Sequence, residues 1–134
     1  MFSNFNHYIL FLGKTFLFNL IIAILKLRGD SLVVSATSGV AAKLLIDGST
    51  VHSSYGVPLI VLPESLCDLN PNTSKGKLAL SAKVLIFDEV GMLDKNILEM
   101  LDKSLKTLCN NTLPFGGKTV LMSGGLFETI ENDY

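Results

Sequence analysis

The sequence Val84-Leu85-Ile86-Phe87-Asp88-Glu89 contains four consecutive apolar residues followed at once by two carboxylates. A short apolar run of this kind predicts a strand buried on both faces, as in a parallel sheet. The two acids would then emerge at the carboxyl end of that strand, where open α/β sheets bind their ligands. The stretch therefore predicts an α/β domain with Asp88 and Glu89 at its functional edge.

The segments around this stretch predict further strands that alternate with helices. Residues 32–36 are apolar and β-branched, and Ser38 is a natural N-cap for the helix that follows. Apolar residues recur at helical spacing over residues 93–108, with charged residues between them and Asp94 as the expected cap. Residues 119–122 form one more strand candidate. The alternation predicts a three-layer domain with a mainly parallel sheet between two layers of helices.

The other segments carry weaker signals. Residues 2–11 are expected to be extended or loop, and residues 15–27 are long enough for a helix that Arg28-Gly29-Asp30 ends. Glycine, proline and asparagine recur through residues 46–77, which predicts mainly loop with short pieces of structure.

Length and composition limit the classes of protein to consider. With 134 residues the chain suits one domain, spanning residues 1–134. The 11 basic residues nearly balance the 12 acidic ones, so any contact with nucleic acid must be local. The two cysteines, Cys67 and Cys109, lie far apart and form no metal-ligand pattern with His7 and His52. This usage indicates a reduced compartment and neither a disulfide framework nor a zinc site.

The tripeptide Gly13-Lys14-Thr15 matches the end of a phosphate-binding loop. In such loops the lysine reaches the β and γ phosphates, and the threonine hydroxyl holds Mg²⁺ at the start of a helix. The position five residues before Gly13 is Tyr8 instead of glycine, and bulky residues occupy positions 10–12. Such residues adopt positive φ only at a cost, so half of the loop pattern is absent.

Together the two motifs predict the ancestry of a P-loop nucleoside triphosphatase, in which Mg²⁺ accompanies the nucleotide. Asp88 would hold Mg²⁺, usually through water, and Glu89 would orient and deprotonate the water that attacks the γ phosphate. Taken separately, each motif has a structural explanation: a solvated strand end for the acids, and a chance tripeptide in an apolar helix for the lysine. Their order, with strands in the right places, favours the catalytic interpretation.

Six segments in order resemble the petite-integration-frequency family of superfamily-one DNA helicases, which includes the helicases of Helitron transposons. These segments are Gly13-Lys14-Thr15-Phe16-Leu17, Ala36-Thr37-Ser38-Gly39-Val40-Ala41-Ala42, Thr50-Val51-His52-Ser53 leading to Val57-Pro58-Leu59, Phe87-Asp88-Glu89-Val90-Gly91-Met92, Pro114-Phe115-Gly116-Gly117-Lys118 and Ser123-Gly124-Gly125-Leu126-Phe127. The resemblance covers nearly the whole chain, and its order is more specific than any single motif.

The resemblance implies ATP-dependent 5′-to-3′ unwinding of DNA by two RecA-like domains with ATP between them. It also implies roles in DNA repair, recombination and telomere maintenance, and a location in the nucleus, with the mitochondrion as the other compartment that the family uses. This chain is similar to the first RecA-like domain. The implied site residues are Gly13, Lys14, Thr15 and Thr129 for the nucleotide, Thr15 and Asp88 for Mg²⁺, Asp88 and Glu89 for hydrolysis, and Thr37, Ser38, Thr50 and His52 for single-stranded DNA. For these last four, capping of backbone groups or contact with water is an equal alternative.

The chain also departs from the family. The family has an Asp and a Gln where this chain has Leu126 and Thr129, and that Gln senses the γ phosphate. The sequence reaches Tyr134 before any second domain, which would supply the opposing wall of the cleft and an arginine finger. A second hypothesis is therefore a catalytically inactive relic that keeps the fold as a weak DNA- or partner-binding module.

A third hypothesis is a small membrane-anchored protein, because the stretch from Tyr8 to Leu27 is unusually apolar. Lys14 and Asn19 interrupt this stretch, and no basic segment precedes it. A buried helix without membrane contact is the favoured interpretation.

Overall fold

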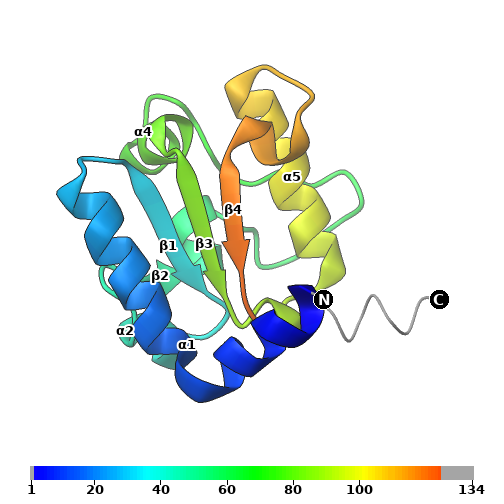
Figure 1. Cartoon of the computed structure of the whole chain (residues 1–134). Helices are drawn as coiled ribbons and strands as arrows, with labels where there is room; N and C mark the ends of the chain where they lie inside the picture. The colour runs from blue at the N-terminus through cyan, green and yellow to red at the C-terminus, as the bar shows by residue number, and fades with distance from the viewer. Residues whose placement is uncertain (1, 125–134) are drawn as a thin grey trace.

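The computed structural model describes residues 2–124, and their side chains from Lys14 onward. Four parallel strands form one sheet in the order β2-β1-β3-β4, with helices on both faces (Figure 1). The elements are α1 (Phe2–Leu27), β1 (Leu32–Ala36), α2 (Gly39–Lys43), β2 (Ser49–Thr50), α3 (Val51–Tyr55), α4 (Ser74–Ser81), β3 (Val84–Asp88), η1 (Val90–Met92), α5 (Lys95–Cys109), η2 (Pro114–Gly117) and β4 (Thr119–Met122). The three-layer α/β prediction is confirmed.

Strand β3 is the most deeply buried strand of the sheet, and all five of its residues are buried. It pairs with β1 from Leu32 opposite Val84 to Ala36 opposite Asp88, and with β4 on its other side. Successive side chains of a strand point to opposite faces, so each face of β3 contributes to a different core. Apolar and polar residues do not alternate along β3, because helices cover both faces of the sheet.

The two cores lie on opposite faces of the sheet. One joins β3 to α1 and α2, and its buried members are Phe18, Ile22, Val34, Ala36, Ala41, Ala42, Leu45, Val84 and Ile86. The larger core joins the sheet to α3, α4 and α5. In this core the Phe87 ring stacks on Tyr55 at a centroid distance of 5.6 Å and lies 6.3 Å from the ring of Phe115. Burial raises the pKa of the Tyr55 phenol, so this side chain stays neutral inside the core.

Helix α1 is longer than the sequence predicts. It begins at Phe2, so the expectation of an extended or loop segment over residues 2–11 is wrong. The physical reason lies in the composition, because residues 2–12 contain neither proline nor glycine and so nothing that stops a helix. The carboxyl end of α1 is as predicted, because the helix stops just before Arg28-Gly29-Asp30. Gly29 has a φ of 80°, and the N–H of Asp30 donates to the carbonyl of Leu25.

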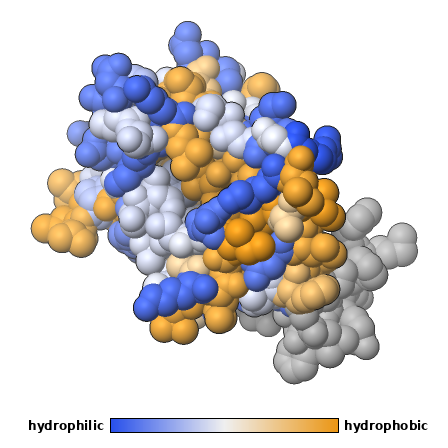
Figure 2. Space-filling view, turned by 90° about the vertical axis from the view of Figure 1, so that its left-hand side faces the viewer, coloured by the Kyte–Doolittle hydropathy of each residue, from blue (hydrophilic) through white to orange (hydrophobic). Residues whose placement is uncertain are grey.

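Helix α1 is apolar on two sides. Phe18 and Ile22 face the sheet, whereas Phe16, Leu20, Ile24 and Leu27 are exposed on the outer side. Figure 2 shows hydrophobic residues crossed by hydrophilic ones on the side of the molecule that carries α1. The inward side confirms the predicted buried helix. Within the part of the chain that the structure describes, no helix has the combination of length and apolarity needed to span a bilayer.

The predicted helix caps are confirmed. The Ser38 hydroxyl accepts a hydrogen bond from the N–H of Ala41 at the start of α2, and the Asp94 carboxylate accepts one from Asn96 at the start of α5. These side chains satisfy N–H groups that have no partner inside the helix. The region expected to be mainly loop contains β2, α3 and the start of α4, with irregular backbone between α3 and α4.

Candidate functional site

The carboxyl ends of the four parallel strands meet at one edge of the sheet. Asp88 is the last residue of β3, Thr50 the last of β2, and Thr37 and Ser123 directly follow β1 and β4. This edge is the ligand-binding edge of open α/β sheets. The structure therefore gathers polar side chains from all four strand ends.

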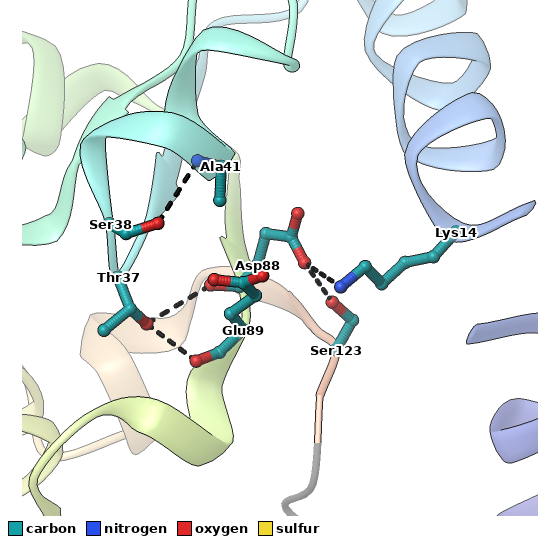
Figure 3. Close-up of polar contacts among 7 residues, drawn as sticks. All are labelled: Lys14, Thr37, Ser38, Ala41, Asp88, Glu89 and Ser123. Carbon is teal, nitrogen blue, oxygen red and sulfur yellow. Dashed lines mark hydrogen bonds and ion pairs between the residues drawn. The ribbon is translucent and has the colours of Figure 1, made fainter. Parts of the chain in front are cut away.

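Asp88 is the centre of a buried polar cluster. Its Oδ1 lies 2.8 Å from the Nζ of Lys14 and accepts a hydrogen bond of 2.7 Å from the Ser123 hydroxyl (Figure 3). The Asp88 side chain is 4% exposed and the Lys14 side chain 21%. A carboxylate this buried requires a compensating cation and hydrogen-bond donors, and these two residues supply them. Helix α1 thus brings Lys14 to an acid far away in the sequence.

Glu89 follows with an unusual backbone conformation. Its φ and ψ are 58° and 39°, in the left-handed region that costs energy for a residue with a side chain. The Thr37 hydroxyl donates to the Glu89 carbonyl at 2.7 Å, and the N–H of Val90 donates to the Ser123 carbonyl at 2.8 Å. These contacts with the neighbouring strand ends hold the turn that directs the chain from β3 into η1.

Gly124 allows the end of β4 to lie close to the turn at Glu89. Its φ is 94°, and a Cβ at this position would lie 2.9 Å from the Cα of Glu89. The N–H of Gly91 also donates to the Gly124 carbonyl. The end of β4 thus supports the segment that carries both acids.

The residues predicted for the nucleotide have a different backbone from the expected one. Gly13 and Thr15 lie within α1, and residues 8–13 are helical instead of forming a loop. Helical N–H groups donate to carbonyls of the preceding turn, so they do not point at a phosphate. Bulky residues in place of the loop glycines explain this difference. Thr129 lies outside the described residues.

The residues predicted for DNA lie at the same edge of the sheet, on the ends of β1 and β2. The hydroxyls of Ser38 and Thr50 accept hydrogen bonds from the first turns of α2 and α3, and Thr37 contacts Glu89. His52 is half-buried in α3. Three of the four side chains therefore have structural hydrogen bonds.

Ser123 is the functional candidate that the sequence prediction missed. A signal was present, because Ser123 directly follows an apolar strand, as Asp88 and Glu89 follow theirs. Serine is common in turns, so Ser123 could be assigned to the site only from the pairing of β4 with β3.

A parallel sheet with a lysine and an aspartate joined at its carboxyl edge defines an α/β domain with a ligand site at that edge. The chain belongs to the PIF1-like helicase family, whose model matches residues 11–131. It is 34% identical over 101 residues to the ATP-dependent DNA helicase PIF1 of Emericella nidulans, a match that covers 74% of this chain and 13% of that protein.

Solved structures give the same result. The chain is similar to Bacteroides Pif1 bound to single-stranded DNA, with a TM-score of 0.70 and 28% identity over 91% of this chain and 30% of the other. The Pif1 helicase from Bacteroides in complex with ADP-AlF3 and single-stranded DNA gives a TM-score of 0.63 and 30% identity, covering 78% of this chain and 27% of the other. The chain thus spans less than a third of the length of these relatives.

Replacing Thr37 by valine is expected to lower the free energy of unfolding by about 1 kcal/mol, because the valine cannot donate to the Glu89 carbonyl. Urea unfolding followed by circular dichroism measures the change. Thr37→Ser keeps the hydroxyl and serves as the matched control. A loss in Thr37→Ser with none in Thr37→Val would show that the methyl group of Thr37, and not its hydrogen bond, stabilises the turn.

Proposed function

We propose that this chain is the first RecA-like domain of a 5′-to-3′ ATP-dependent DNA helicase, with residues 1–134 as a single domain. The observation that carries the proposal is the contact between Lys14 and Asp88 at the carboxyl edge of the sheet. The names of the relatives agree with it, since these proteins are called ATP-dependent DNA helicases.

In this proposal Lys14 leaves Asp88 and neutralises the β and γ phosphates of ATP, while Gly13, Thr15 and Thr129 contact the nucleotide. Thr15 and Asp88 hold Mg²⁺, since hydroxyl and carboxylate oxygens are the ligands that this hard cation prefers. Bound Mg²⁺ would neutralise charge that develops on the phosphates. Glu89 accepts the proton of the attacking water, for which its half-buried carboxylate at the sheet edge is suited.

The same edge is the proposed contact with single-stranded DNA, through Thr37, Ser38, Thr50 and His52. None of these residues is a lysine or an arginine, so they would contact DNA locally through hydrogen bonds, in agreement with the net charge of -1. The other proposed partner is a second RecA-like domain that closes the nucleotide cleft. We further propose that the protein acts in the nucleus, in DNA repair, recombination and telomere maintenance, and the family relationship supports this.

One observation favours a second candidate function, that of a non-hydrolysing relative that keeps the fold as a weak DNA- or partner-binding module. Helix α1 occupies residues 8–13, where a phosphate-binding loop would offer backbone N–H groups. Lys14 alone would then have to attract the phosphates.

Titration of a fluorescent ATP analogue into the purified chain in the presence of Mg²⁺ tests the nucleotide site. We expect saturable binding that Lys14→Ala abolishes, because the substitution removes the cation proposed to meet the phosphates. Lys43→Ala is the matched control, since Lys43 is an exposed lysine of α2. No saturable binding, or binding that Lys14→Ala leaves unchanged, would contradict the proposed site.

Phosphate release separates the two candidate functions in a chain that binds the analogue. Hydrolysis of ATP that single-stranded DNA stimulates and Glu89→Gln removes supports the helicase domain. Binding without hydrolysis, with or without DNA and with the second domain of a relative supplied in trans, supports the non-hydrolysing module.

A further inference from the structure

The two oxygens of the Asp88 carboxylate have different surroundings. Oδ1 receives both the Lys14 ammonium at 2.8 Å and the Ser123 hydroxyl at 2.7 Å. Among the side chains of residues 14–124, Oδ2 has no hydrogen-bond or ion-pair partner, and Figure 3 shows it pointing away from both donors. Within this part of the chain, one oxygen is therefore held by two donors, and the other is left without a partner.

The two donors differ in how firmly they are fixed. Ser123 is 2% exposed, its N–H donates to the Phe87 carbonyl at 3.0 Å, and its own carbonyl accepts from Val90. The backbone of Ser123 is thus hydrogen-bonded to the chain on both sides of Asp88, which fixes the place of its hydroxyl. Lys14 instead reaches Asp88 with a long side chain that is partly exposed, and a lysine ammonium moves readily to a stronger anion.

We propose that Ser123 is a positioning residue that keeps the Asp88 carboxylate oriented, so that Oδ2 faces the Mg²⁺ of a bound nucleotide. This inference rests on the proposed nucleotide site. When Lys14 turns to the phosphates, Ser123 remains as the donor to Oδ1. Without the Ser123 hydroxyl, the buried Oδ1 would then have no remaining donor among these two residues, and the carboxylate would be free to rotate.

The test measures how Mg²⁺ changes the affinity of the chain for the fluorescent ATP analogue. For Ser123→Ala we expect the Mg²⁺ concentration at half-maximal effect to rise about tenfold, the size typical of one lost charge-assisted hydrogen bond. Affinity in EDTA should stay unchanged, because Ser123 acts only through Asp88. Ser123→Thr keeps a hydroxyl and should restore the Mg²⁺ dependence.

Ser104→Ala is the matched control. Ser104 is also a buried serine, and its hydroxyl accepts a hydrogen bond from the N–H of Cys67 in the core beside α5. This variant should lose stability without changing the Mg²⁺ dependence. If Ser123→Ala does not fold, Ser123→Cys takes its place, because a thiol is similar in shape but a weak donor.

The outcomes separate the two proposals. A Mg²⁺ dependence in Ser123→Ala equal to that of the unchanged chain overturns the role of Ser123 and leaves the nucleotide site intact. A parallel loss of affinity in EDTA also overturns it, since the effect would then not pass through the cation. If the unchanged chain binds the analogue equally well with and without Mg²⁺, the proposed metal site fails, and the role of Ser123 fails with it.

Discussion

Replacing Phe87 by alanine is expected to lower the free energy of unfolding by about 3–5 kcal/mol. Phe87 is fully buried in the middle of the sheet, where its ring contacts Tyr55 and Phe115. Truncation leaves a cavity. Because β3 is paired with a strand on each side, its backbone cannot shift to close that cavity. Because domains are stable by only about 5–15 kcal/mol, this loss would remove a large part of the stability of the protein. Urea unfolding followed by circular dichroism measures the loss.

Phe16→Ala is the matched control for this substitution. Phe16 lies on the outer side of α1 and is 76% exposed, so its removal should change the free energy of unfolding by less than about 0.5 kcal/mol. A small effect of Phe87→Ala would contradict the central position of β3. A large effect of Phe16→Ala would show that the outer side of α1 is covered in solution.

Replacing Gly124 by alanine is expected to cost roughly 2 kcal/mol or more. Two causes act together, because φ is 94° and the new Cβ would lie 2.9 Å from the Cα of Glu89. The clash involves backbone atoms, which cannot move aside as a flexible side chain can. The substitution should therefore also displace the Glu89 turn. Hydrogen exchange at the N–H groups of Val90 and Gly91, which donate to Ser123 and Gly124, reports this displacement.

Substitutions at two other glycines separate the cost of the positive φ from the cost of the steric clash. Gly29 also has a positive φ, at 80°, but a Cβ there would meet no atom within 4 Å, so Gly29→Ala isolates the conformational cost. Gly39 begins α2 and has open space without a positive φ, so Gly39→Ala should be neutral or slightly stabilising. Equal losses for Gly124→Ala and Gly29→Ala, with unchanged exchange at Val90, would argue against a close packing of Gly124 on Glu89.

The elements that local patterns specify strongly were predictable. The apolar run of β3, the β-branched β1 and the amphipathic α5 each carry a signal within a few residues, and the caps Ser38 and Asp94 have the side chains that helix starts require. The prediction failed at the amino end of α1, where Gly13-Lys14-Thr15 suggested a loop. The local preference of the bulky residues before Gly13 for a helix prevailed over the motif.

The sequence by itself determined a parallel α/β domain with Asp88 and Glu89 at the end of a buried strand, because hydrophobic periodicity and turn residues act over short distances. Only the tertiary structure decided which side chains surround these acids. Lys14 comes from a helix on one face and Ser123 from the neighbouring strand end, and no local pattern links either of them to Asp88. The register of β4 against β3 and the packing of α1 on the sheet create these contacts, because chain segments far apart in the sequence meet only when both cores are buried.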